Sequence, residues 1–266
     1  MRKFKCLLIY SIPIFVIING CNPKEFAFGQ IPSQEDAWYK MIINIPTPEG
    51  FTREKCDTTS FGYYLRCLQL KTNNNEVLLF NGLKKGNQSA QFAVVKMDVG
   101  TQDLQQCADA VMRLRGEYLF QQKSYDLLHF NFLSDGKPRF FKDYCNGDYS
   151  YKKFRSWMNY IFSYANTGSL LNELKKVNVV SEVKIGDVFI VRGNPYGHAV
   201  IVVDVAVNSK GEKLFMLAQS YMPAQEIHVL KNNNNEEINP WYSTNIENTL
   251  ITPEYIFTKN DLYRFQ

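Results

Sequence analysis

Histidine is scarce in this sequence, and the residue spacings typical of metal sites are missing. Its 266 residues include three histidines, His129, His198 and His228. No CxxC pair and no HxxxH or HExxH pattern occurs, and zinc sites are commonly built with such spacings. The sequence therefore predicts no structural metal and no cofactor.

An excess of charge is also missing once the first twenty residues are set apart. Those residues hold Arg2, Lys3 and Lys5 and no acidic residue, so 27 of the 30 basic residues remain against 26 acidic ones. The remainder has no lysine and arginine cluster with interleaved aromatic residues, which is the pattern of a nucleic-acid surface. We therefore expect no nucleic-acid partner.

The first twenty residues have the layout of an export signal. Their positive start is followed by the apolar run Leu7–Ile18, which is long enough for a signal-peptide core and too short to span a bilayer. The run ends in Asn19-Gly20-Cys21, which resembles the lipobox of bacterial lipoproteins, where the cysteine is lipidated. A weak N-terminal anchor with an incidental cysteine is the alternative.

The lipobox resemblance implies how the chain is divided and where it resides. Residues 1–20 would be a signal peptide and residues 21–40 a lipidated Cys21 with a tether, so the membrane is a partner through this lipid anchor. The location is then the cell envelope outside the cytoplasm, either periplasmic or surface-exposed. We expect residues 41–266 to form a single α+β domain, because the chain is 45% hydrophobic and 14% aromatic.

The strongest strand signals lie on either side of a short turn. Ile185–Val191 and Val200–Val207 are apolar and β-branched, and two glycines and a proline separate them. His198 directly follows Gly197, where a missing side chain lets another group come close. Two interpretations are open: a half-buried strand histidine bonded to a carbonyl, or a catalytic base.

The most helical segment is Thr101–Gln122. Asp103 with Gln106 three residues later predicts a capping box at its start, and the apolar residues follow one helix face. Cys107 lies in the first turn on this face, and it is either an inert core residue or a nucleophile. A helix N-terminus favours the second interpretation, because its dipole and free N–H groups lower a thiol pKa.

Four cysteines remain outside the export signal: Cys56, Cys67, Cys107 and Cys145. Cys145 falls in a polar loop and is expected to be incidental. In an oxidising compartment the four can form two disulfides, with Cys56 and Cys67 the nearest pair. A bridged Cys107 would exclude the nucleophile interpretation.

The order of these motifs resembles the papain-like cell-wall amidase and endopeptidase families, CHAP and NlpC-like. Gln106-Cys107 opens a helix, Gly186-Asp187 precedes a strand, Gly197-His198 opens the next, and Ala218-Gln219-Ser220 ends a third. The resemblance covers about residues 103–230. It implies a papain-like core at about 101–230, an antiparallel sheet packed against an N-terminal helix that carries the cysteine.

The same resemblance implies roles for single residues. Cys107 would be the nucleophile and His198 the base, while Gln106 or the Cys107 backbone N–H would lie near the oxyanion. Asp187 would be a structural turn residue. The substrate would be peptidoglycan or another peptide amide, and His129 and His228 are competing bases on strand-like runs.

The residue that orients the imidazole is left open. CHAP proteins commonly carry Glu-Gln-Asn where this chain has Ala218-Gln219-Ser220, so the acidic candidate is missing. A two-residue hairpin turn places Gln219 opposite Val200, on the face of His198, whereas a three-residue turn places Ser220 there. Gln219 is preferred, because its amide oxygen can accept from the ring.

Over its whole length the chain also resembles an uncharacterised family of bacterial envelope lipoproteins. The resemblance rests on QQCADAVMRLR, on IGDVFI with GHAVIVVD, and on LAQSYMPAQEIHVL. It supplies no activity, so two functions are carried forward: a cysteine amidase or peptidase, and a catalytically inactive papain-like binding or structural lipoprotein. No role is assigned to the tail, Trp241–Phe265.

Overall fold

A sheet of antiparallel strand pairs organises the computed structural model, which describes residues 39–193 and 196–266. These residues fall in one unit, Trp38–Gln266. The predicted signal peptide, Cys21 and all but the end of the predicted tether lie outside the described residues. Mixed helix and strand content with a mostly antiparallel large sheet is confirmed.

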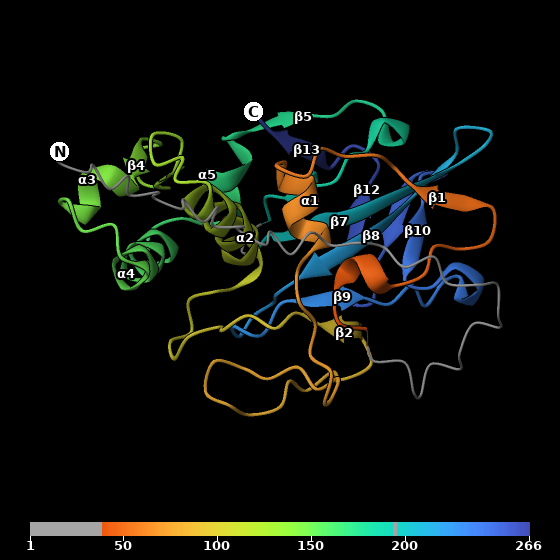
Figure 1. Cartoon of the computed structure of the whole chain (residues 1–266), viewed down its shortest axis with the longest axis horizontal. Helices are drawn as coiled ribbons and strands as arrows, with labels where there is room; N and C mark the ends of the chain where they lie inside the picture. Colours follow the sequence, from red (N-terminus) through yellow and green to blue (C-terminus); the bar gives the residue numbers. More distant parts are fainter. Residues whose placement is uncertain (1–38, 194–195) are drawn as a thin grey trace, which may run out of the picture. The chain divides into compact units, whose positions relative to one another are not determined.

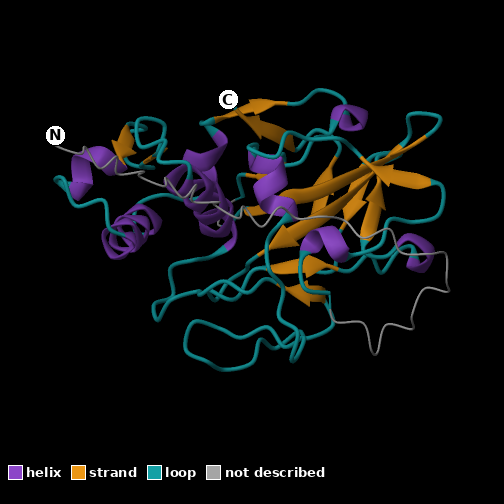
Figure 2. Ribbon diagram, viewed as in Figure 1, coloured by secondary structure: helices purple, strands orange, loops and turns teal. Residues whose placement is uncertain are grey.

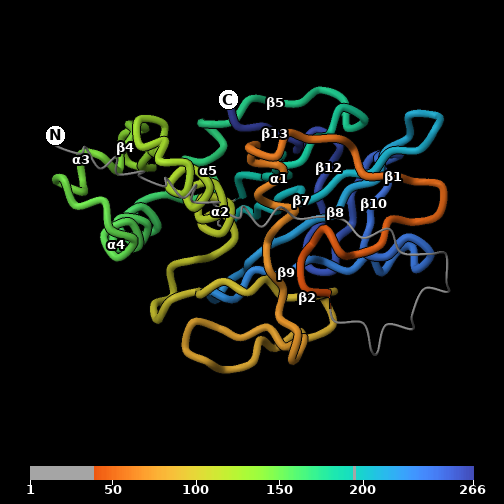
Figure 3. The backbone as a smooth tube through the Cα atoms, in the orientation of Figure 1, coloured from red at the N-terminus to blue at the C-terminus, as the bar shows by residue number. Residues whose placement is uncertain are grey.

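The strand order of this sheet is β2-β9-β8-β7-β6-β13-β5, and β1 and β10 add to β7 and β8 (Figure 1). Its strands are β1 (Phe51–Arg53), β2 (Gln91–Val94), β5 (Leu174–Lys176), β6 (Val188–Val191), β7 (His198–Asn208), β8 (Lys213–Gln219), β9 (His228–Leu230), β10 (Trp241–Ser243) and β13 (Leu262–Phe265). Two separate hairpins pair β3 (His129–Asn131) with β4 (Pro138–Phe140) and β11 (Thr249–Ile251) with β12 (Ile256–Thr258). Strand β13 brings the C-terminal segment back against β6 and β5 (Figure 3).

Most of the helical residues gather beyond one end of this sheet (Figure 2). The helices are α1 (Phe61–Arg66), α2 (Cys107–Gln121), α3 (Phe141–Cys145), α4 (Tyr151–Phe162) and α5 (Thr167–Leu171), with 3-10 turns η1 (Ile42–Asn44), η2 (Val180–Glu182) and η3 (Glu236–Ile238). Helix α2 contacts α4 and α5 on one side and β7 on the other, so it joins the helical part to the sheet.

Both faces of β7 are buried, which explains its nearly continuous apolar sequence. Ala199 and Ile201 point into the larger core, which also contains residues of α2 and α4. Val200 and Val202 point into the second core, which contains Phe257 of β12. Successive side chains of β7 therefore alternate between the larger core and the second core near the start of the strand.

Helix α2 begins six residues later than the start predicted at Thr101. Its N-terminal cap is Gln106, and Cys107 is its first residue. The Asp103 carboxylate does not cap the helix. It accepts hydrogen bonds from the Gln106 side chain at 3.1 Å and from the Ala224 backbone N–H at 2.6 Å, which ties this segment to the loop after β8.

The expectation for Cys145 is wrong. It does not lie in an exposed loop but is the last residue of α3, with 1% of its surface exposed. Its thiol donates to the Lys142 carbonyl at 3.3 Å. The polar residues around it face solvent, while the sulfur packs in the core. The prediction of a loop rested on the polar composition of this segment and missed that a short helix can bury one side chain.

The turn before β6 depends on Gly186 and Asp187. Gly186 has φ +92°, a conformation that side chains disfavour. The Asp187 carboxylate accepts the Lys184 backbone N–H at 2.8 Å and two hydrogen bonds from Arg264 of β13, at 2.6 and 2.8 Å. This turn therefore fixes the start of β6 and holds the C-terminal strand beside it.

Replacing Gly186 by alanine is expected to destabilise the protein more than replacing Gly211. Both glycines have positive φ, which costs an L residue about 1 kcal/mol. A Cβ at Gly186 would also lie 2.9 Å from Cδ1 of Phe61, whereas a Cβ at Gly211 would meet nothing within 4 Å. For Gly186→Ala, the overlap adds about 1–3 kcal/mol to the loss in the free energy of unfolding. Denaturant unfolding of both variants measures the two losses. Equal losses for Gly186→Ala and Gly211→Ala would contradict the turn geometry.

Candidate active site

The Cys107 sulfur lies at the N-terminus of α2 and beside the start of β7. The backbone N–H groups of Ala108, Ala199 and Cys107 itself lie near it and favour its thiolate form. The Asp109 carboxylate accepts the Gln106 N–H at 3.1 Å and so closes the first turn of the helix. Because Ala199 directly follows His198, these contacts place the thiol next to the strand that carries the histidine.

A cleft of about 200 Å³ opens onto this thiol. Its lining combines the start of α2, the end of α4, the start of α5 and the turn before β7. The lining residues are Asp103, Leu104, Gln106, Cys107, Ala108, Asp109, Phe162, Ala165, Asn166, Thr167, Tyr196, Gly197 and Met222. Asp103, which is exposed, and Asp109, which is buried, are the carboxyl side chains among them.

Gly197 permits close packing at the mouth of the cleft, as expected from its place before His198. A Cβ at this position would lie 2.0 Å from the Val191 carbonyl oxygen and 2.7 Å from the Thr167 hydroxyl. Such separations are well inside van der Waals contact. The start of β7 therefore approaches β6 and α5 more closely than any other residue type would allow.

Burial decides the protonation state of the thiol. Loss of solvent and, to a smaller extent, the nearby Asp109 carboxyl raise the pKa of Cys107 to about 11, although the three backbone N–H groups act in the opposite direction. The expectation of a lowered pKa is therefore wrong, because desolvation outweighs the helix N-terminus. Burial likewise raises the pKa of Asp109 well above its usual range.

The His198 ring is buried, with 1% of the residue exposed, and its Nε2 atom lies 2.9 Å from Oε1 of Gln219. The ring also packs against Tyr221 and Tyr255, with centroid distances of 4.7 and 4.9 Å. Burial lowers the pKa of His198 to about 4. The imidazole is therefore neutral near pH 7.

Two tyrosines link the thiol to the imidazole, and no hydrogen bond joins the two groups directly. Burial is the main cause that raises the pKa of Tyr221 and of Tyr255, and the charge of Cys107 contributes to both shifts. These two tyrosine rings are also the ones that pack on His198. Gln219 is the hydrogen-bond partner of the His198 ring in the described part of the chain. The two groups thus share two tyrosine neighbours, and both are uncharged near pH 7.

A bulge in β7 sets the register beside His198. Near the hairpin turn Val205 pairs with Phe215, and nearer the site Val202 pairs with Leu217. One extra residue, Val203, lies between these two pairings. The strand therefore changes register by one residue along its length.

This register change decides which side chain of β8 faces His198. The turn is the three-residue kind, with Asn208 opposite Glu212, and its register alone would place Ser220 on that face. The bulge shifts the pairing by one residue, so Gln219 instead of Ser220 lies on the face of His198. The hydrogen bond between Gln219 and His198 is the direct result.

Ser220 performs a different task at the end of β8. Its hydroxyl can donate to the Gln105 carbonyl, 3.0 Å away, or to the Gln225 carbonyl, 2.8 Å away. It does not contact the His198 ring. Ser220 therefore links the sheet to the segment just before Cys107, and the alternative in which it orients the imidazole is not what the structure has.

The acidic residue that is missing from Ala218-Gln219-Ser220 is supplied by the C-terminal tail. Glu254, in the turn between β11 and β12, accepts a hydrogen bond from Nε2 of Gln219 at 2.7 Å. Its carboxylate also pairs with Lys85 at 2.5 Å. Sequence reasoning missed both residues, because Glu254 comes 35 positions after Gln219 and no pattern in the irregular tail links the two.

The other histidines and cysteines are separated from the cleft. His129 is in β3 and packs against Phe140 at a centroid distance of 4.7 Å, and His228 is fully buried behind Gln219. Like His198, neither is part of the cleft lining. Cys107 and Cys145 are free thiols, which contradicts the hypothesis of two disulfides among the four cysteines.

Residues 39–193 and 196–266 contain neither a cluster of metal ligands nor a membrane-spanning helix. No group of three or more histidine, cysteine, aspartate or glutamate side chains there could hold a metal ion. Within the same ranges no helix combines the length and the apolar character needed to cross a membrane.

Together the fold and this site define a mixed α and β protein with a thiol in a cleft and a buried imidazole that shares two tyrosine neighbours with it. The chain belongs to the family described as Domain of unknown function (4846), whose model matches residues 42–148 and 140–264. No curated protein and no solved structure matches the chain.

Alkylation of Cys107 by iodoacetamide is expected to be slow near neutral pH and to rise with a midpoint near pH 11. The reason is the raised pKa of the buried thiol, since the thiolate is the reactive form. Asp109→Asn should move the midpoint to lower pH, because it removes a carboxylate that opposes the thiolate. Mass spectrometry of Cys107 over a pH series measures both effects.

Asp103→Asn is the matched control, since Asp103 lines the same cleft but does not affect the pKa of Cys107. It should leave the midpoint unchanged. A wild-type midpoint at or below pH 8.5 would show that the helix N-terminus prevails over burial.

Proposed function

We propose that this chain is a cysteine hydrolase of the papain-like type, an amidase or peptidase anchored in the cell envelope. One observation carries the proposal: the Cys107 thiol, at the first residue of a helix and in the lining of a cleft, shares two tyrosine neighbours with His198. The Nε2 atom of His198 lies 2.9 Å from Oε1 of Gln219. The order of helix, strand and strand is that of the papain-like families.

The first half of the reaction transfers an acyl group to sulfur. His198 Nδ1 takes the thiol proton while the sulfur attacks the amide carbonyl carbon, because two neutral buried groups favour a concerted transfer over a standing ion pair. The oxyanion is held by the Cys107 N–H and the second Gln106 amide proton, about 3–4 kcal/mol for each well-aligned donor. The carbon–nitrogen bond then breaks, and the amine leaves with the proton from Nδ1.

The second half of the reaction consumes one water. Nδ1 takes a proton from water as the water oxygen attacks the thioester carbonyl carbon. The carbon–sulfur bond breaks, and the sulfur regains the proton from the ring. One amide and one water thus give one carboxylic acid and one amine, with Cys107 and His198 restored.

The substrate we propose is a peptide amide of peptidoglycan. The lipobox resemblance at Cys21 would hold the domain at an envelope surface, where this polymer is the abundant amide. The exposed Asp103 carboxylate at this cleft suits a substrate that presents N–H donors or an amine and does not suit an anionic group.

Wild-type protein is expected to release new amino groups from purified peptidoglycan, and Cys107→Ala and His198→Ala should lower this rate by about 10³-fold or more. The loss is expected because each removes a group that forms or breaks a bond. Amine release and mass spectrometry of soluble fragments provide the measurement.

Cys145→Ala and His129→Ala are the matched controls, since they remove the same side-chain types from α3 and β3, which contribute neither to the cleft nor to the His198–Gln219 hydrogen bond. Both should keep wild-type activity. No release by the wild type, or equal release by wild type, Cys107→Ala and His198→Ala, would exclude this reaction on peptidoglycan.

The raised pKa of Cys107 favours a second candidate, a catalytically inactive papain-like fold that binds envelope glycan or peptide or serves a structural role. A thiol that stays protonated near pH 7 does not act as a nucleophile, so this fold would use neither Cys107 nor a base for catalysis. Co-sedimentation with peptidoglycan without any amine release, unchanged in Cys107→Ala, would identify this function.

Envelope anchoring is proposed separately from catalysis. Cys21→Ser is expected to shift the full chain from the membrane fraction to the soluble fraction, because it removes the thiol that would carry the lipid. Fractionation of cells that express each form measures the distribution. Membrane association equal to that of the wild type would contradict the lipid anchor.

A further inference from the structure

The amide of Gln219 lies at the centre of a buried polar network. Its oxygen faces Nε2 of His198 at 2.9 Å, and its nitrogen faces Glu254 at 2.7 Å and Nε2 of His228 at 3.4 Å. Gln219, His198 and His228 are each at most 1% exposed. The direction of this amide therefore depends on the neighbouring protein groups.

Two acceptors fix that direction. A carboxylate can only accept hydrogen bonds, so Glu254 requires the NH₂ side of the Gln219 amide. His228 requires the same side: its Nδ1 lies 2.9 Å from the Glu226 carbonyl oxygen and must carry the ring proton, which leaves Nε2 as an acceptor. A flipped amide would place its oxygen against the carboxylate.

The amide direction in turn fixes the tautomer of His198. With Oε1 of Gln219 facing Nε2, a neutral His198 ring must carry its proton on Nε2 and leave a lone pair on Nδ1. Nδ1 has no hydrogen-bond partner among the described residues. This is the atom that the proposed reaction requires as the base.

We propose that Glu254 is a positioning residue, which acts through Gln219 to hold His198 as the Nε2–H tautomer with Nδ1 free for proton transfer. The inference rests on the proposed cysteine hydrolase function for its consequence, but the tautomer itself requires no reaction. Lys85, at 2.5 Å, balances the Glu254 charge and keeps the carboxylate in place. The hairpin of β11 and β12 thus completes the site from outside the motif region.

The direct test is ¹⁵N NMR of the three histidine rings in the full chain near pH 7. Wild-type His198 should show a protonated Nε2 and an unprotonated Nδ1, and His228 the reverse pattern as an internal reference. In Glu254→Gln the new amide can donate as well as accept, so His198 should become a mixture of tautomers while His228 stays unchanged. Glu237→Gln, in the exposed turn η3, should match the wild type.

Amine release from peptidoglycan gives the second readout. Glu254→Gln should lower kcat/KM by about 10²-fold through kcat, because it misorients a reacting group without touching substrate. In a Gln219→Ala background the same change should have no further effect, since Glu254 acts only through that amide. Additive losses would indicate a separate role.

An Nδ1–H tautomer of His198 in the wild type would overturn the proposal without any variant, and so would an unchanged His198 tautomer in folded Glu254→Gln. Absence of hydrolysis by the wild type would contradict the proposed function alone, because the ring tautomers can be read without substrate. The two failures are therefore distinguishable.

Discussion

The candidate site depends on one extra residue in β7. The bulge at Val203 converts the register set by the hairpin turn into the register that brings Gln219 opposite the face of His198. Asp204 follows the bulge, is fully buried, and is paired with Arg53 of β1 and Arg66 of α1. A buried carboxylate with two arginine partners holds the bulge in place, since losing either partner would leave a charge poorly compensated.

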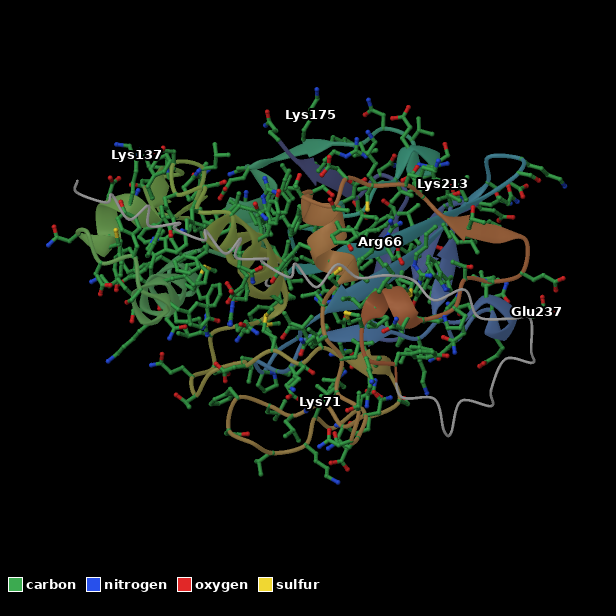
Figure 4. The ribbon with its side chains drawn as sticks, in the orientation of Figure 1. Arg66, Lys71, Lys137, Lys175, Lys213 and Glu237 are labelled. Carbon is green, nitrogen blue, oxygen red and sulfur yellow. The ribbon has the colours of Figure 1, made fainter. Side chains whose placement is uncertain are left out.

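The same bulge explains why Arg66 is inside the molecule. Its guanidinium also donates to the Val205 carbonyl at 3.0 Å and to the Cys56 sulfur at 3.0 Å. In Figure 4 Arg66 lies between α1 and the sheet, whereas Lys137 points outward. Helix α1 is therefore attached to β7 at the point where the register changes, and the position of Gln219 depends on contacts far from the cleft.

The sequence allowed the local parts of the site to be predicted, and the structure shows why the longer-range parts were not. Cys107 at a helix start and His198 at a strand start follow from local patterns of apolar spacing and turn residues. The choice between Gln219 and Ser220 followed from no local pattern. The turn alone would place Ser220 on the face of His198, whereas the bulge at Val203, five positions before Asn208, places Gln219 there. Glu254 depends on how the irregular tail folds back, which is set by packing of Phe257 on the second core.

The pKa of Cys107 shows a second limit of local reasoning. A helix N-terminus stabilises a thiolate by a modest amount, and the three backbone N–H groups on the sulfur do act in that direction. Desolvation depends on how completely the neighbouring elements cover the sulfur, and the sequence does not contain that quantity. Only 6% of the residue is exposed, so burial prevails.

The two faces of the sheet explain why the site lies at a strand end. Helix α2 shares a core with Ala199, whereas His198 belongs to the opposite face, with Phe257. A side chain from each face can meet only where the strand begins and no longer separates them. Gly197 makes this possible, because it brings β7 close to α5 and leaves a cleft beside the sulfur. The thiol thus comes from one core and the imidazole with its amide and carboxylate partners from the other, and each core can hold its own groups neutral and oriented before any substrate arrives.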